Sequence, residues 1–397
     1  MTSVNREGIW TSALNAATSS WAASCASPVR FYDTTLRDGE QTVGVVFTPE
    51  QKLSIARKLD ELGIGRIEAG FPRVSAEDAD AFRRIQAAGL RAEVWGFGRA
   101  AQADVDVLVE LRVSHTVLEI PSSAIKLRAY EMEPADARRK VAETIRYARS
   151  HGITVAFFPV DATRADMDFL RSLYVAAAEA GAEEAAVVDT IGACGPEATE
   201  FLVRQVREWL GEKIPLHYHG HNDFGLATSC AIAAVRGGAT WIQGTINGMG
   251  ERAGNADLGE IAMALHCLYG VPVEMNLSKI REVSAAVSEA GNYQTDAWKP
   301  IVGKNLFVRE SGAVASQFHI PEAIEPFSSE IVGARREILL GKKSGIDSIS
   351  LKARELGLEI PDTLRKEVLA RVKTRGTEKR GLVSDEEFRG IVRAVRG

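Results

Sequence analysis

The stretch VRFYDTTLRDGEQ, at residues 29–41, begins as a short apolar run and ends in polar residues. An amphipathic pattern, PEQKLSIARKLDELG, follows at residues 49–63, so the pair predicts a strand and then a helix. The same alternation continues along the chain. Eight strand-like runs lie at residues 29–35, 66–71, 91–97, 115–120, 153–160, 183–190, 214–221 and 240–246. Repeated strand–helix units predict a parallel β-sheet.

Two folds hold such a sheet, and the residues after the first strand decide between them. An open doubly wound sheet is expected to carry a glycine-rich phosphate loop after an early strand. Residues 33–41, DTTLRDGEQ, contain no such loop. Eight strands over about 220 residues instead fit a closed barrel with helices outside. We therefore expect an α/β fold, a (β/α)8 TIM barrel followed by a helical C-terminal accessory region.

The domain division follows the change in pattern along the chain. Residues 1–28 are rich in Ser and Ala but lack the basic start and continuous apolar core of a signal peptide, so we expect a flexible N-terminal arm. Residues 29–275 form the predicted catalytic barrel. Residues 276–397 form the predicted accessory region, which starts with a helix, LSKIREVSAAVSEAG, continues as loop-rich sequence and ends in helical patterns.

Composition excludes several classes of protein. The chain has 397 residues, 25% of them charged, and a formal net charge of -5, with both signs spread along it. This pattern predicts neither a nucleic-acid partner nor a membrane-surface patch, and no apolar run approaches the roughly 20 residues of a membrane helix. The four cysteines show no CxxC spacing. Reduced thiols and a cytoplasmic location are therefore expected.

Polar residues cluster where the predicted strands end, which is where barrels of this kind carry their active sites. His219 and His221 share one side of the seventh strand, because side chains at i and i+2 point the same way. Asp38 would complete a facial set of ligands that leaves positions open for substrate. His217 has the same parity but lies deeper. One carboxylate and two imidazoles suit Zn, Mn, Co or Fe, and Mg less well.

Three separated motifs then resemble one family. DTTLRDGEQ at 33–41, HGHNDFGLA at 219–227 and GMGERAGN at 248–255 resemble the homocitrate synthase and isopropylmalate synthase group, and the likeness extends over nearly the whole chain after residue 28. The resemblance implies a metal-dependent acyltransferase that condenses acetyl-CoA, or a related acyl-CoA, with a 2-oxo acid and releases CoA. It also implies a homodimer in which the accessory region serves as a lid or in dimerisation.

The resemblance carries roles to individual residues. It implies a metal site of four residues: Asp38, His219, His221 and Asn255. It implies that Arg37 stabilises the enolate or oxo-acid oxygen and that Glu68 is a polar active-site residue. It implies that Gln41 lies in the substrate site. It also implies that Arg164 and Thr190 hold the carboxylates of the acceptor.

The chain departs from the family where a general base is expected. The family's HESGIH stretch reads Arg309-Glu310-Ser311-Gly312-Ala313-Val314 here, so Val314 replaces the histidine associated with proton abstraction. Val160 replaces an acidic residue, and Lys343 replaces a further histidine. His319, Glu68 or a metal-bound hydroxide are candidate replacements for the base. Two alternatives stay open: a lyase or aldolase that cleaves a C–C bond in a 3-hydroxy acid or acyl-CoA, and a non-catalytic paralogue.

Overall fold

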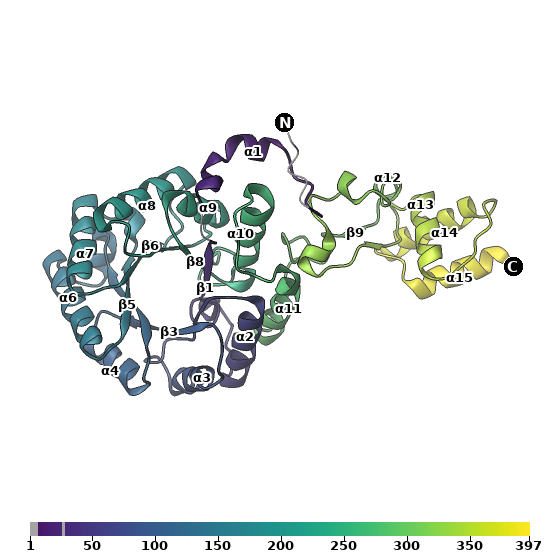
Figure 1. Ribbon diagram of the computed structural model, residues 1–397. Helices are drawn as coiled ribbons and strands as arrows, with labels where there is room; N and C mark the ends of the chain where they lie inside the picture. Colours follow the sequence, from purple (N-terminus) through teal and green to yellow (C-terminus); the bar gives the residue numbers. More distant parts are fainter. Residues whose placement is uncertain (1–6, 26–27) are drawn as a thin grey trace. The chain divides into compact units, whose positions relative to one another are not determined.

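The computed structural model describes residues 7–25 and 28–397. The described residues form two compact units: residues 14–25 and 28–295, and residues 7–13 together with 296–397. The first unit is a closed barrel of eight parallel strands in the order of the sequence, β1 to β8, as the sequence predicted (Figure 1). The strands are β1 Arg30–Asp33, β2 Arg66–Glu68, β3 Glu93–Arg99, β4 His115–Pro121, β5 Thr154–Val160, β6 Glu184–Asp189, β7 Leu216–Gly220 and β8 Trp241–Gly244.

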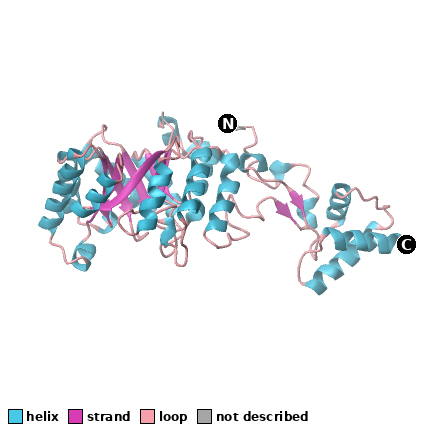
Figure 2. Ribbon diagram, turned by 90° about the horizontal axis from the view of Figure 1, so that it is seen from below, coloured by secondary structure: helices cyan, strands magenta, loops and turns pink. Residues whose placement is uncertain are grey.

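Helices surround the strands, so the strands form the inner layer of the unit (Figure 2). The helices of this unit are α1 Leu14–Thr18, α2 Pro49–Leu62, α3 Ala76–Gln86, α4 Gln102–Glu110, α5 Ala124–Ala129, α6 Pro134–Ser150, α7 Met167–Glu179, α8 Pro196–Leu210, α9 Ala227–Gly237, α10 Leu258–Ala264 and α11 Ile280–Ala290. Local sequence sets their ends. Helix α2 starts with a capping box, in which Thr48 and Gln51 bond each other's backbone N–H, and ends at Gly63 with φ of 91°.

The barrel interior is filled by side chains and is not a pore. Residues of alternating parity point inward and form one buried cluster, which consists of Tyr32, Trp95, Phe97, Val117, Ala156, Phe158, Val160, Ala186, Val188 and Trp241. The interior therefore leaves room for chemistry only at the carboxyl ends of the strands.

A buried ion network occupies the amino-terminal end of the barrel. Arg66 donates from Nη1 and Nη2 to the Glu184 carboxylate at 2.6 and 2.9 Å. Its guanidinium lies between the rings of Trp95 and Trp241, 4.5 and 3.7 Å from their centroids. His217 Nε2 lies 2.5 Å from Glu184 Oε2. His217 thus belongs to this network, in agreement with its predicted deeper place in the strand.

The second unit is small and built around its own core. It contains β9 Val308–Arg309, β10 Glu337–Ile338, α12 Gly312–Ala315, α13 Ile346–Glu355, α14 Arg365–Lys379 and α15 Asp385–Arg396. Strands β9 and β10 pair in parallel, and Ile349, Val368 and Phe388 of the last three helices are fully buried in one cluster. The helical tail that the sequence predicted is therefore a packed subdomain.

The predicted N-terminal arm is divided between the two units. Residues 1–6 and 26–27 lie outside the described residues. Ile9 bridges to Phe327 in the second unit, whereas Trp21 packs on Tyr269 in the barrel unit with ring centroids 5.1 Å apart. The boundary between the two compact units follows residue 295, whereas the sequence predicted that the accessory region starts at residue 276. The difference arises because α11 packs on α2 and so belongs to the barrel unit.

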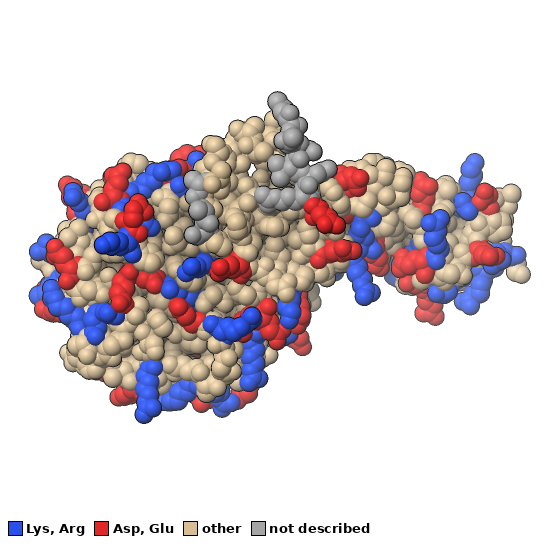
Figure 3. All heavy atoms as spheres, in the orientation of Figure 1, with Lys and Arg blue, Asp and Glu red and all other residues tan. Residues whose placement is uncertain are grey.

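Within residues 7–25 and 28–397, no helix has the length and apolar character to cross a membrane. On the face shown in Figure 3, acidic and basic side chains lie interspersed. This mixture agrees with the mixed charge of the sequence.

The network at the barrel base yields a stability prediction. Arg66→Met should lower the free energy of unfolding by about 3–5 kcal/mol, because Glu184 is left as a buried carboxylate without its cation. Urea denaturation followed by circular dichroism measures the change. Arg84→Met is the matched control, because Arg84 forms an exposed pair with Glu50, and such pairs contribute at most about 1 kcal/mol. Equal effects of the two substitutions would contradict the buried network's role.

Candidate metal centre and active site

The loop after β1 is braced against β8, and this bracing places Asp38. Asp33 accepts from the Thr35 backbone N–H and hydroxyl, both at 2.8 Å. Thr35 Oγ1 in turn accepts from the Ile246 backbone N–H at 2.9 Å. A Cβ on Gly39 would lie 3.1 Å from Met249 Cγ, so the chain turns closely past the β8 loop there. The DTTLRDGEQ motif therefore folds into a rigid turn at the carboxyl ends of the strands.

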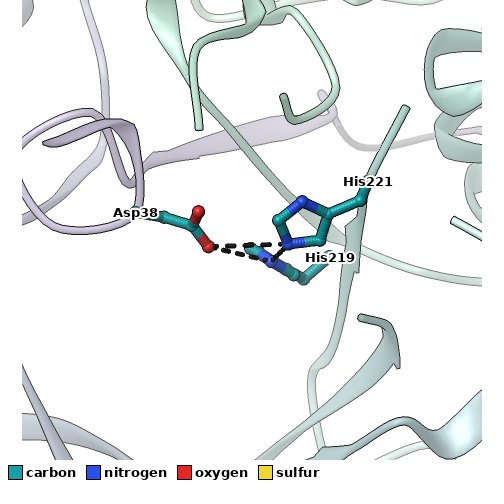
Figure 4. A group of neighbouring side chains, drawn as sticks. All are labelled: Asp38, His219 and His221. Atoms are coloured by element: carbon teal, nitrogen blue, oxygen red, sulfur yellow. Dashed lines mark hydrogen bonds and ion pairs between the residues drawn. The ribbon is translucent and has the colours of Figure 1, made fainter. Parts of the chain in front are cut away.

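Asp38, His219 and His221 converge from two sides of the barrel mouth (Figure 4). Asp38 Oδ2 lies 3.4 Å from His219 Nε2 and 3.7 Å from His221 Nε2. The two imidazole Nε2 atoms are 3.4 Å apart. Cis ligands of one cation are separated by roughly 3.0–3.4 Å when the bonds are about 2.1 Å long. Two of the three separations lie in this range, and the third, between Asp38 Oδ2 and His221 Nε2, is about 0.3 Å longer, so the three atoms are arranged as a facial ligand set would be.

The protonation states also suit a cation. Burial lowers the pKa of His221 to about 4, with partial opposition from Asp38. Burial alone would raise the pKa of Asp38, but the Arg37 guanidinium and the two imidazoles hold it well below its usual value. At neutral pH His221 is thus neutral and Asp38 is a carboxylate, the forms that bind metals.

Asn255, the fourth predicted metal-site residue, lies beside this set. Its Nδ2 donates to Asp38 Oδ1 at 2.9 Å and to the Met249 carbonyl at 3.1 Å. Its Oδ1 is buried without a hydrogen-bond partner. A buried amide oxygen without a donor is costly, and a cation held by the neighbouring triad would satisfy it.

Arg37 links the candidate metal centre to β2. Its Nη1 bonds Asp38 Oδ2 at 2.9 Å, its Nε bonds Glu68 Oε1 at 2.5 Å, and its guanidinium lies 4.1 Å from the Phe97 ring centroid. Burial opposes its charge, but Glu68 and Asp38 raise the pKa of Arg37 above its usual value. Nη2 is buried and has no hydrogen-bond partner among the residues that the structure describes. This N–H group is available to a substrate oxygen.

Two of the predicted substrate residues lie together on the other side of the mouth. Arg164 donates from Nε and Nη2 to the Asp161 carboxylate, both at 2.8 Å, while Thr190 Oγ1 accepts from the Asp161 backbone N–H at 2.8 Å. Asp161 has φ of 66°, and its carboxylate also accepts from the Ser123 hydroxyl at 2.5 Å. Arg164 is therefore oriented by a buried carboxylate, and its Nη1 is not used in that pair.

The remaining predicted site residues have other environments. Gln41 is exposed at the end of the turn that follows Asp38. His319 is exposed between α12 and the short helix Pro321–Ala323, in the other compact unit. The structure thus brings together Asp38, His219, His221, Asn255, Arg37 and Glu68, and separately Arg164 and Thr190.

Glu119 and Phe158 were not singled out by the sequence analysis, whereas Asp189 belongs to the polar cluster that was predicted at the strand ends. Glu119 lies near the end of β4, and Phe158 of β5 meets His219 edge to face, with ring centroids 5.3 Å apart. Asp189, at the end of β6, accepts from Thr163 Oγ1 at 2.8 Å. Strand parity predicts that Glu119 points inward, because it lies two residues after Val117, which belongs to the interior cluster.

Comparison with known proteins agrees with this arrangement. A family model described as HMGL-like matches residues 28–287, and one described as homocitrate synthase post-HMGL domain-like matches residues 301–380. The homocitrate synthase AksA of Methanopyrus kandleri is 42% identical over 366 residues, which cover 92% of this chain and 91% of that protein. The (R)-citramalate synthase CimA of Methanocaldococcus jannaschii is 40% identical over 374 residues, 93% of this chain and 75% of that protein.

Solved structures support the fold. A hydroxymethylglutaryl-CoA lyase from Pseudomonas aeruginosa matches with a TM-score of 0.62 at 17% identity and covers 70% of this chain and 97% of that one. At this identity the likeness concerns the fold alone. The family models and the relatives at about 40% identity carry the assignment. The chain belongs to the HMGL-like family and carries the homocitrate synthase post-HMGL domain after its barrel.

Proposed function

We propose that this protein is an acyltransferase that condenses acetyl-CoA with a 2-oxo acid, forms a new carbon–carbon bond and releases CoA. Its relatives at 39–42% identity are named homocitrate, citramalate and isopropylmalate synthases. The observation that carries the proposal is the convergence of Asp38, His219 and His221 beside an arginine with an unpaired N–H group. A 2-oxo acid offers carboxylate and keto oxygens to such a site.

The cation belongs to the proposal, and its identity stays open among Zn, Mn, Co, Fe and Mg. Asp38, His219 and His221 would hold it, with the unpaired Asn255 Oδ1 beside them. When bound, a divalent cation supplies Lewis-acid polarisation of the keto group.

The protein's own groups do the positioning. Arg37 stays charged and aims Nη2 at the position of the acceptor's oxygens, where it stabilises developing negative charge. Glu68 holds the guanidinium through Nε. Arg164, oriented by Asp161, offers its remaining N–H groups to an acceptor carboxylate, and Thr190 supports the Asp161 backbone. Gln41 stays a predicted substrate contact.

The lyase alternative is not favoured. The relatives that share about 40% identity with nearly the whole chain are synthases, while lyases match at 17–19% identity in fold. The accessory unit also matches a synthase-type domain. A non-catalytic paralogue is not favoured either, because the triad and Arg37 are in place. The homodimer, the His319 role and the cytoplasmic location stay predictions.

The direct test is release of free CoA. Purified protein with a divalent cation, acetyl-CoA and a panel of 2-oxo acids should release CoA with at least one acceptor, and mass spectrometry should detect the matching hydroxy acid. The panel should include 2-oxoglutarate, pyruvate and 2-oxoisovalerate, the acceptor types that separate the synthases named above. No CoA release with any acceptor and any cation would contradict the proposal.

The metal site has its own test. His219→Ala should weaken binding of Mn²⁺ or Zn²⁺ by at least about 100-fold, since removing a ligand costs more than the 10–100-fold measured for outer partners. Isothermal titration with the metal alone measures this without any turnover. His151→Ala is the matched control, because His151 is an exposed imidazole at the end of α6. Unchanged affinity in His219→Ala would exclude the proposed ligand set.

Arg37 gives a third test. Arg37→Lys keeps the charge beside Glu68 and Asp38 but removes the Nη2 group, so kcat should fall by about 10²–10³-fold. Steady-state CoA release, corrected for metal content, measures the loss. Arg84→Lys, on the exposed face of α3, should keep the kcat of the unaltered protein. If Arg37→Lys retained full kcat, Nη2 would have no part in the reaction.

A further inference from the structure

Glu119 faces the reaction space from the strand opposite the candidate metal centre. It lies on β4, where it pairs with Arg99 of β3 and Phe158 of β5. Val117 lies two residues before it and belongs to the barrel's interior cluster, so Glu119 points into the same interior, one step nearer the mouth. Its neighbour Phe158 contacts His219.

Each of the other carboxylates of the mouth has at least one oxygen held by a hydrogen bond or an ion pair, although Glu68 Oε2 is buried without a partner among the described residues. Glu68 is paired with Arg37, Asp161 with Arg164, and Asp223 with Arg252. Asp189 accepts from one hydroxyl and two backbone N–H groups, and Asp33 is held by Thr35. Asp38 belongs to the triad.

Glu119 differs from all of these groups. Within residues 7–25 and 28–397, its carboxyl group makes neither a hydrogen bond nor an ion pair, although its side chain is partly buried. A partly buried, inward-facing carboxyl group without a partner stands free to exchange a proton with a substrate. Val160, on the neighbouring strand, and Val314 carry no titratable group.

We propose that Glu119 is the general base that takes the α-proton from the acetyl group of the thioester. This inference rests on the proposed condensation. The proton moves from the methyl carbon to a Glu119 carboxylate oxygen, and the C–H electron pair forms the C=C bond of the enolate. The enolate carbon then attacks the keto carbon of the 2-oxo acid. The keto oxygen becomes an alkoxide and accepts a proton, and water later cleaves the thioester to free CoA.

The electrostatic surroundings suit this role. Burial raises the pKa of Glu119 to about 7, with Arg37 and Arg99 acting in the opposite direction and Glu68 and Asp104 adding to the rise. Tyr130 also interacts electrostatically with Glu119. A base with a pKa near the working pH combines a sizeable basic fraction with a strong pull on the proton. Because the carboxylate form increases as pH rises through 7, kcat/KM should rise over the same range.

Glu119→Gln tests the proposal, because glutamine keeps the size and shape of the side chain but cannot serve as the carboxylate base. We expect kcat for CoA release to fall by about 10²–10⁴-fold, with KM for the 2-oxo acid changed less than about threefold, and the rise of activity through pH 7 to disappear. In the unaltered protein, reversible proton transfer should carry solvent deuterium into the methyl group of acetyl-CoA. Glu119→Gln should not show this exchange. Glu110→Gln, on the exposed end of α4, is the matched control and should behave as the unaltered protein.

A folding defect can be separated from a catalytic one. Burial raises the pKa of Glu119 from 4.5 to about 7, so its ionisation destabilises the folded state progressively between these values. Glu119→Gln should therefore melt higher than the unaltered protein at pH 8, by less at pH 5.5, and not below about pH 4.5. Glu119→Asp should recover part of the activity and the pH dependence.

The outcomes distinguish this inference from the proposed function. If the unaltered protein releases no CoA, the condensation itself is wrong. If it is active and Glu119→Gln keeps kcat within about threefold of it, or loses only affinity for the acceptor, Glu119 is not the base.

Discussion

Closure of the sheet between β1 and β8 is the constraint on which the site depends. Four residue pairs join these strands, from Arg30 with Trp241 to Asp33 with Gly244. A Cβ on Gly244 would lie 2.4 Å from the Ala256 carbonyl, so the chain after β8 passes directly over this seam. Residues near 38, 220 and 255 are far apart in sequence, and closure brings them to one rim. The convergence of Asp38, His219 and His221 is a consequence of that closure.

The buried charged residues inside the barrel form two separate groups. At the base, Arg66 is enclosed by Trp95 and Trp241 and paired with Glu184. At the mouth, Arg37 bridges Asp38 and Glu68. At the base, the Arg66 and Glu184 side chains are fully paired with each other and their neighbours, which suits a structural role, although Oε1 of Gln243, which bonds His217, is buried without a partner among the described residues. The mouth group keeps unpaired atoms on Arg37, Glu68 and Asn255. Unpaired buried polar atoms are costly in a purely structural core, and they mark the end of the barrel where a substrate is expected.

The replacement of the family's base histidine by Val314 made the reaction difficult to assign from the sequence. Glu119 offers an answer inside the barrel unit itself, on a strand that faces Arg37. Such a base would not depend on the accessory unit for its position. His319 would then not be required for proton transfer.

The sequence by itself determined the features that depend on local pattern. These include the eight strands, the helix ends such as the Thr48 cap, and the shared orientation of His219 and His221, which follows from strand parity. The motifs also predicted site roles for Asp38, Arg37 and Asn255, which the structure places close together. Only the tertiary structure decided which groups are paired. Glu68 is held by Arg37, whereas no residue in the described part of the chain pairs with the Glu119 carboxyl group. Pairing depends on distances across a closed barrel, between strands whose proximity the chain order does not specify.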